Sequence, residues 1–196
     1  TVFDNDIIPT KLYPINVDVD KINKIEINKL KKEGNKSVTY KAMSSDDNKK
    51  IASKFDIELT ENSQVIIIRN VDFNEFLVNG TRGVIKHLDE NYVIISDIEG
   101  KTHTINYYRD VYNNKFSSYV THMPIRTCYA LSIHKSQGMT IDALELDLGP
   151  NIFACGQSYT ALSRAKSLRS IKILDVSKDS FRTHAKVKNF YREMSE

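Results

Sequence analysis

The first part of the chain is patterned as a short strand, a long helix and another strand. An apolar run at residues 11–15 predicts a buried strand. Polar residue Asn16 suits the N-cap of a following helix, and Gly34 suits its end. Residues 37–43 predict a further strand, and the polar segment 44–54 a solvated loop or a short helix. The apolar positions at roughly helical spacing are Ile15, Val19, Ile22, Ile25 and Leu30.

The middle of the chain has the pattern of an antiparallel meander. Residues 63–68 are an unbroken apolar-rich run, which is typical of a strand covered on both faces. From residue 81 to residue 122, short alternating runs are separated by tight turns. We therefore expect residues 81–122 to form a small antiparallel β-barrel inserted into the main domain. Its tyrosines offer faces for base stacking, but core packing is favoured for most of them; they are Tyr92, Tyr107, Tyr108 and Tyr112.

The α/β pattern returns after residue 123. Segments 126–133, 143–148 and 170–174 predict strands, and segments 156–163 and 181–194 contain predicted helices. Strands separated by helices indicate a mostly parallel sheet flanked by helices. The fold class is therefore α/β, with residues 1–80 and 123–196 as one domain and residues 81–122 as its insert.

Charge and cysteine content exclude only a few classes of function. The formal net charge is +3 and the pI is about 8.7, which permits a nucleic-acid partner without requiring one. Cys128 and Cys155 stand in apolar stretches without metal-ligand spacing, so we expect both to be reduced and buried in an intracellular protein. No apolar run is long enough for a membrane span, and no metal site is expected. Because Thr1 is not an initiator Met, we expect a piece of a longer polypeptide.

One tripeptide superficially resembles a phosphate-binding loop. Gly100, Lys101 and Thr102 follow one another, but the loop needs a glycine five residues before Gly100, and that position is Ile95. The tripeptide also falls between two predicted strands, where a hairpin turn is the better interpretation. No other glycine precedes a lysine, so this chain alone is not expected to hydrolyse ATP.

Two polar segments carry candidate chemistry. Residues 134–140 combine hydroxyls, an amide, a cation and a glycine, which suits phosphate contact or, equally, a loop that caps the next element. Arg164 lies at the end of the predicted helix 156–163. A guanidinium there can pair with a phosphate as an arginine finger. The alternative is a surface arginine that interacts with the end of its own helix.

These segments resemble motifs of superfamily-one DNA helicases of the PIF-one type. Residues 12–16 resemble motif IV, although Ile15 stands where the family usually has threonine. Residues 65–70 and 77–83 resemble the segment leading into the inserted barrel of the Src-homology-3 type. Residues 133–142 resemble motif V and residues 156–165 motif VI, and Gly149–Pro150 and the Phe190–Tyr191 ending also fit. These blocks follow the family order, and the match spans nearly the whole chain.

The resemblance implies the second RecA-like domain of a 5′-to-3′ DNA helicase, with roles in replication, repair and recombination. ATP and Mg²⁺ would be held mainly by an N-terminal RecA-like domain of the same polypeptide, because motifs Q, I, Ia, II and III have no counterpart here. Arg164 would be the catalytic arginine finger, and Gln137 and Gly138 would contact the nucleotide. A monomer acting on single-stranded DNA, with no membrane partner, is implied. The implied DNA-binding residues are Asn16, His134, Lys135, Ser136 and Thr140.

A competing interpretation is a non-enzymatic nucleic-acid-binding module. The expected barrel or the segment 134–140 could bind DNA without any motor activity. A third interpretation is a degenerate, purely structural RecA-like subunit. The presence of Arg164, Gln137 and Gly138 argues against a scaffold, which has no need of them.

Overall fold

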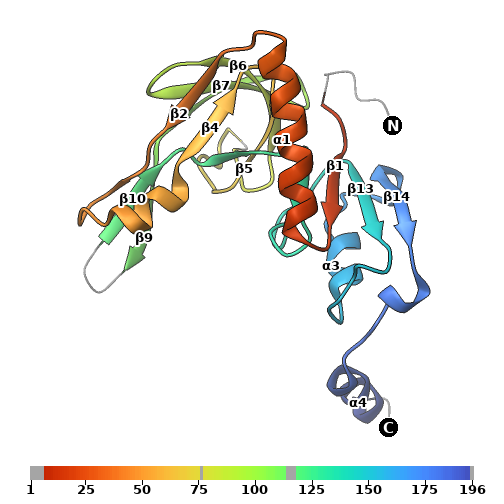
Figure 1. Ribbon diagram of the computed structural model, residues 1–196. Helices are drawn as coiled ribbons and strands as arrows, with labels where there is room; N and C mark the ends of the chain where they lie inside the picture. Colours follow the sequence, from red (N-terminus) through yellow and green to blue (C-terminus); the bar gives the residue numbers. More distant parts are fainter. Residues whose placement is uncertain (1–6, 76, 114–117, 195–196) are drawn as a thin grey trace. The chain divides into compact units, whose positions relative to one another are not determined.

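The computed structural model describes residues 7–75, 77–113 and 118–194 (Figure 1). These residues divide into two compact units. The parallel-sheet unit contains residues 9–22 and 130–194, and the antiparallel unit contains residues 7–8, 23–75, 77–113 and 118–129. No helix among the described residues has the length and apolar character needed to cross a membrane.

The parallel-sheet unit is built on a four-stranded sheet of order β12-β1-β13-β14, with every neighbouring pair parallel. Strand β1, one of the two inner strands, alternates buried and partly buried side chains. Its Leu12 is fully buried and is paired with Leu131 of β12 and Leu146 of β13. The expected parallel sheet is thus confirmed. The elements are β1 (Thr10–Tyr13), β12 (Ala130–Ser132), β13 (Leu144–Leu148), α3 (Gln157–Leu162), the 3-10 helices η2 (Leu168–Ser170) and η3 (Lys178–Ser180), β14 (Ile171–Val176) and α4 (Ala185–Met194).

Helix α1 (Asn16–Lys32) begins in the parallel-sheet unit and continues into the antiparallel unit. It ends as expected at Gly34, whose φ of 87° is readily adopted by glycine. The N–H of Gly34 donates to the carbonyl of Lys31, and the N–H of Asn35 donates to that of Leu30. This hydrogen-bond pair is a Schellman motif, which satisfies carbonyls that the helix itself leaves free.

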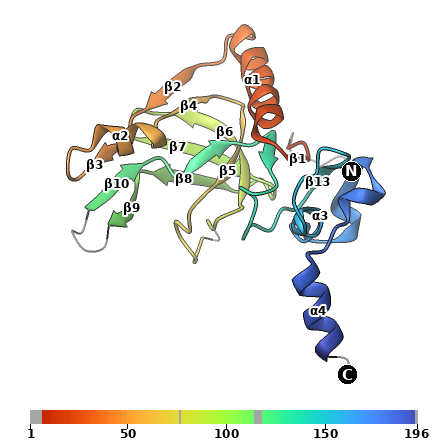
Figure 2. The same cartoon turned by 60° about the horizontal axis from the view of Figure 1, so that its bottom comes forward.

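The antiparallel unit contains a five-stranded sheet of order β11-β5-β6-β7-β8 and two smaller sheets, β3-β10-β9 and β2-β4. Every residue of β5 is buried, as the apolar run predicts. The meander β6-β7-β8 is also confirmed (Figure 2). The elements are β2 (Ser37–Tyr40), β3 (Met43–Ser44), α2 (Lys49–Ala52), the 3-10 helix η1 (Ser53–Phe55), β4 (Ile57–Thr60), β5 (Gln64–Ile67), β6 (Arg82–Leu88), β7 (Tyr92–Asp97), β8 (Thr102–Asn106), β9 (Tyr108–Asn113), β10 (Ser118–His122) and β11 (Ile125–Thr127).

The single strand expected over residues 126–133 is wrong. The chain forms two strands there, β11 and β12, because β11 pairs with β5 and β12 pairs with β1 in another sheet. Between them, the N–H of Cys128 donates to the carbonyl of Gln64, and the N–H of Tyr129 donates to Oδ1 of Asn23. These bonds give partners to the backbone N–H groups between the two strands.

One further expectation is corrected, and the domain ranges stay untested. Cys128 is buried as expected, but Cys155 is exposed, because it lies in the loop before α3 rather than in the sheet. The compact units do not test the expected domain ranges; in the antiparallel unit, β5 and β11 pair into the sheet of β6, β7 and β8. The assignment of residues 1–80 and 123–196 to a motor domain, and of 81–122 to its insert, stays a prediction.

Candidate nucleic-acid interface

The segment that resembles motif VI begins with a glycine that starts helix α3. Gly156 has φ of 75°, a conformation that L side chains rarely adopt, and occupies the N-cap position. Ala161 is fully buried, so the small side chains on this helix allow it to pack closely against β13. The helix stops at Leu162, and Arg164 therefore lies just beyond its C-terminal end.

Arg164 is partly buried and makes three hydrogen bonds to its own unit. Its Nε donates to the carbonyl of Thr160 at 3.1 Å, and its Nη1 donates to the carbonyl of Met139 at 3.1 Å. Its Nη2 donates to Oγ of Ser163 at 2.8 Å. The guanidinium thus interacts with the end of its own helix, as the alternative interpretation expects. These bonds engage three of the five N–H groups of the side chain. To contact a phosphate bound by another domain, the guanidinium must therefore break these bonds or use its other two N–H groups.

The segment that resembles motif V is a loop anchored by two buried side chains. Ser136 is fully buried, and its hydroxyl donates to the carbonyl of Ile133 at 2.8 Å. Met139 is also buried, while Gly138 has φ of 78° between them. This anchoring leaves the other side chains of the loop at the surface, namely those of His134, Lys135, Gln137 and Thr140. A direct phosphate contact by the Ser136 hydroxyl needs a change in this loop, because the hydroxyl faces inward.

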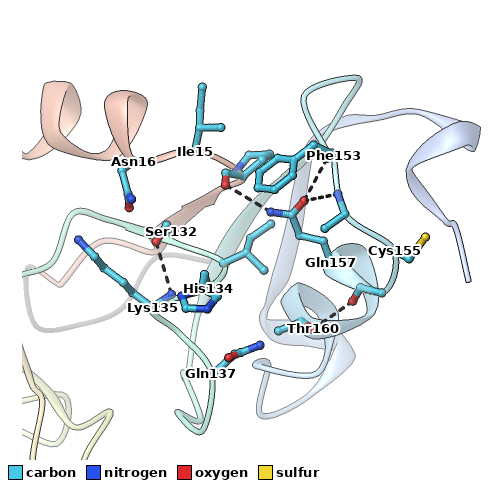
Figure 3. A pocket seen from close by; sticks show the side chains of 14 residues that line it. Ile15, Asn16, Ser132, His134, Lys135, Gln137, Phe153, Cys155, Gln157 and Thr160 are labelled. Carbon is cyan, nitrogen blue, oxygen red and sulfur yellow. Dashed lines mark hydrogen bonds between the residues drawn. The ribbon is translucent and has the colours of Figure 1, made fainter. Parts of the chain in front are cut away.

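A pocket of about 490 Å³ lies where this loop approaches the end of β1 and the start of α3. Figure 3 shows Phe153 and Gln157 on one side of it, with Asn16 and Lys135 on the other. The described lining residues are Pro14, Ile15, Asn16, Ser132, Ile133, His134, Lys135, Gln137, Phe153, Ala154, Cys155, Gly156, Gln157 and Thr160.

Gln157 connects two walls of this pocket. Its side chain is largely buried, and its Nε2 donates to the carbonyl of Pro14 at 3.3 Å. Its Oε1 accepts from the N–H groups of Phe153 at 3.1 Å and Ala154 at 3.3 Å (Figure 3). The residue therefore joins the end of β1 to the loop before α3.

The pocket has the electrostatics of an anion site. Lys135 is exposed at its edge, and none of the described lining residues is Asp or Glu. Asn16 is the first residue of α1, whose first-turn N–H groups have no partner inside the helix and form its positive end. Asp18 in the same first turn offsets part of that charge. A phosphate is a suitable occupant of such a site.

The sequence predicts some of the residues that line this pocket. It names Asn16, His134, Lys135 and Gln137, which the fold brings together from distant segments. The other named residues, which are Gly138, Ser136, Thr140 and Arg164, are not among its lining residues. It missed Phe153 and gave no role to Gln157, although Gln157 stands inside the segment that resembles motif VI. Phe153 carries no local signal, because it is an isolated aromatic residue in a loop.

Neither a phosphate loop nor a metal cluster is present among the described residues. Gly100 has φ of 82° in the tight turn between β7 and β8, so the turn interpretation of residues 100–102 is confirmed. No group of three or more His, Cys, Asp or Glu in this part of the chain is placed to hold a metal ion. The described residues therefore do not fit a complete site for ATP and Mg²⁺.

The parallel sheet and the loops that resemble helicase motifs agree with what comparisons with known proteins find. The chain is 32% identical to the ATP-dependent DNA helicase PIF1 of Xenopus laevis over 96% of its length, which is 31% of that helicase. Its structure matches a Pif1 of Bacteroides sp. in complex with ADP-AlF4, with a TM-score of 0.79, 23% identity and coverage of 100% of this chain and 46% of that one.

A further solved structure, of a Bacteroides Pif1 helicase in complex with ADP-AlF3 and single-stranded DNA, matches with a TM-score of 0.68 and 22% identity, over 100% of this chain and 46% of that one. No family model matches. The chain belongs to the Pif1 family of DNA helicases. It spans about a third of the length of the Xenopus relative, so the activity of a whole helicase is a matter for proposal.

Proposed function

We propose that this chain is the C-terminal motor part of an ATP-dependent 5′-to-3′ DNA helicase. It grips the backbone of single-stranded DNA and supplies a cation to ATP that another RecA-like domain of the same polypeptide binds. The observation that carries the proposal is the acid-free pocket, in which Lys135, His134 and Asn16 meet at the positive end of α1. Its contacts with phosphates would be independent of base sequence and sensitive to salt.

Four of the proposed DNA contacts suit the surface of this unit. Asn16, His134, Lys135 and Thr140 are exposed and carry side chains that donate to phosphate oxygens. Ser136 is proposed to act indirectly. Its buried hydroxyl donates to the backbone of the loop that carries His134 and Lys135, and so stabilises that loop. The related Bacteroides helicase whose structure contains single-stranded DNA supports this assignment of the ligand.

Arg164 is proposed as the residue that acts on ATP. Its guanidinium is planar and always charged, and it can pair with the phosphoryl group in transfer. Gln137 and Gly138 follow in the same loop that Arg164 contacts through Met139, so they are proposed to touch the nucleotide as well. The related Bacteroides structures in complex with ADP-AlF4 and ADP-AlF3 support a nucleotide in this family. Mg²⁺ and the triphosphate would be held by the other domain.

Strand displacement tests the motor proposal. The natural polypeptide that carries this chain is mixed with duplexes bearing either a 5′ or a 3′ single-stranded tail, with and without ATP. We expect ATP-dependent separation of the 5′-tailed duplex only. Separation that starts from the 3′ tail, or binding of DNA without any ATP-driven separation, contradicts the proposal and favours a binding module.

Two single lysine variants test whether Lys135 contacts a DNA phosphate. Lys135→Ala is compared with Lys166→Ala, which removes another exposed lysine, located outside the pocket. For Lys135→Ala, we expect weaker binding to single-stranded DNA and a dependence of log K on log salt that is shallower by about 0.7, the value for one phosphate contact. The Lys166→Ala variant should keep the wild-type slope. Equal slopes for both variants would remove Lys135 from the interface.

A further inference from the structure

Phe153 is a large apolar side chain that the fold holds out of the core. Its side chain is 67% exposed, whereas the preceding Ile152 is 3% exposed. Single exposed aromatic residues are common and need no explanation by themselves. Phe153 differs because its surroundings are fixed by specific bonds and because it lines the anion pocket.

The backbone around Phe153 is held by three side-chain bonds. Oε1 of Gln157 accepts from the N–H groups of Phe153 and Ala154. On the other side, Nη2 of Arg182 donates to the carbonyl of Ile152 at 2.7 Å. The backbone that carries the ring is therefore positioned before any ligand arrives, which lowers the ordering cost of binding.

The two sides of the pocket offer complementary chemistry. Phe153 supplies an aromatic face on the side of Gln157, and Lys135 and Asn16 supply polar groups on the other side (Figure 3). A nucleotide has the same division, since its base is a flat π-surface and its phosphate is an anion. The pocket volume of about 490 Å³ is in the usual range for sites that take one small ligand.

We propose that Phe153 is the stacking platform for one base of the single-stranded DNA, with the adjoining phosphate at Lys135 and the start of α1. This inference rests on the proposed function and adds a base contact to its phosphate contacts. Stacking on an aromatic ring does not select among bases, because every base has a π-face. Gln157 is a positioning residue in this arrangement, since it fixes the backbone that carries the ring.

Paired oligonucleotides test the stacking role in the natural polypeptide that carries this chain. One is an oligothymidylate, and the other has the same sugar-phosphate backbone with abasic sites. The variants are Phe153→Ala, Phe153→Leu and Phe153→Tyr. Phe73→Ala is the matched control, because Phe73 is 70% exposed but belongs to the antiparallel unit and is not among the lining residues of the pocket. Affinity is measured by fluorescence anisotropy at fixed salt, and the melting temperature of each variant is recorded.

Stacking predicts a specific pattern of losses. Phe153→Ala should bind the oligothymidylate on the order of ten- to one hundred-fold more weakly than the wild type, the range for loss of one stacked base. Its affinity for the abasic strand should be unchanged. Phe153→Tyr should bind like the wild type, Phe153→Leu should resemble Phe153→Ala, and Phe73→Ala should change neither affinity. Melting temperatures should stay close to that of the wild type, because the ring is exposed.

Other outcomes separate this inference from the proposed function. If the wild type binds single-stranded DNA and Lys135→Ala weakens that binding, but Phe153→Ala binds both strands normally, then the stacking inference is wrong and the proposed grip stands. Equal losses of Phe153→Ala on the two strands also contradict stacking, because an abasic strand has no base to lose. If the wild type binds neither strand, the proposed function fails together with the inference.

Discussion

At the scale of single residues, Arg164 carries the most consequential assignment. Its guanidinium holds the carbonyls of Thr160 and Met139, so it connects helix α3 to the loop at residues 134–140. If it also acts as an arginine finger, Arg164→Ala in the natural polypeptide should lower ATP turnover by on the order of a thousandfold or more. DNA binding should remain largely intact. Arg164→Lys should not restore turnover, because lysine lacks the planar fork of donors.

A matched variant distinguishes catalysis from structure in this experiment. Arg169→Ala removes an exposed arginine from the same unit and should leave ATP turnover unchanged. The melting temperature of Arg164→Ala is measured alongside, since the variant also loses three hydrogen bonds. Normal turnover in the Arg164→Ala variant would refute the finger role.

His122 in the antiparallel unit predicts a pH dependence of stability. Its imidazole is 1% exposed, and Nε2 lies 3.7 Å from Oδ2 of Asp110, beyond hydrogen-bond reach. Burial is the main cause that lowers the pKa of His122, and the nearby Arg69 adds to it, although the Met123 carbonyl and Asp110 act in the opposite direction. The unfolded chain therefore binds the proton more readily than the folded one.

The sign of this effect follows from proton linkage. As pH falls below about 6.5, the ordinary pKa of histidine, the free energy of unfolding should decrease, until His122 is protonated in the folded state too. Urea unfolding followed by circular dichroism between pH 5 and pH 8 measures this slope. His122→Gln should reduce the slope, because it removes this titrating group. An unchanged slope in His122→Gln would assign the pH dependence to other groups.

At the scale of elements, local patterns predict what local forces determine. Helix α1 and its stop at Gly34 follow from apolar spacing and from the conformational freedom of glycine, and both are found. The break between β11 and β12 is invisible locally, because it depends on pairing with β5 and β1, which are distant in the sequence. Sequence patterns thus identify which segments become strands more reliably than which sheet each strand joins.

The end of α1 offers a prediction for one element. Gly34→Ala should destabilise the protein by about 1 kcal/mol, because an L side chain in the left-handed region meets its own backbone. The space around this glycine is open, so no clash with neighbouring atoms contributes. Gly34→Asn should cost less, since Asn tolerates this region better. Chemical unfolding of both variants measures the difference, and equal effects would contradict the conformational explanation.

At the scale of the whole molecule, the sequence predicts the site only in part. Asn16, His134, Lys135 and Gln137 belong to two motif-like segments, and the parallel sheet brings those segments to one pocket. Phe153 and the bridging role of Gln157 depend on how the loop before α3 meets the end of β1. Such a contact between distant segments has no periodicity or spacing that marks it, so it requires the structure.

The last prediction concerns which activities the 196 residues have without other parts of a helicase. The 196 residues alone should show no ATP hydrolysis above background, because Gly100 lies in the hairpin turn between β7 and β8 and the described residues hold no metal cluster. The same preparation should still bind single-stranded DNA with an affinity that falls as salt rises, since the pocket and the start of α1 lie in one compact unit. ATPase assays with and without oligothymidylate, next to salt-dependent anisotropy, check both halves. Hydrolysis by this chain would mean that it contains a nucleotide site of its own, whereas salt-independent DNA binding would contradict a phosphate grip.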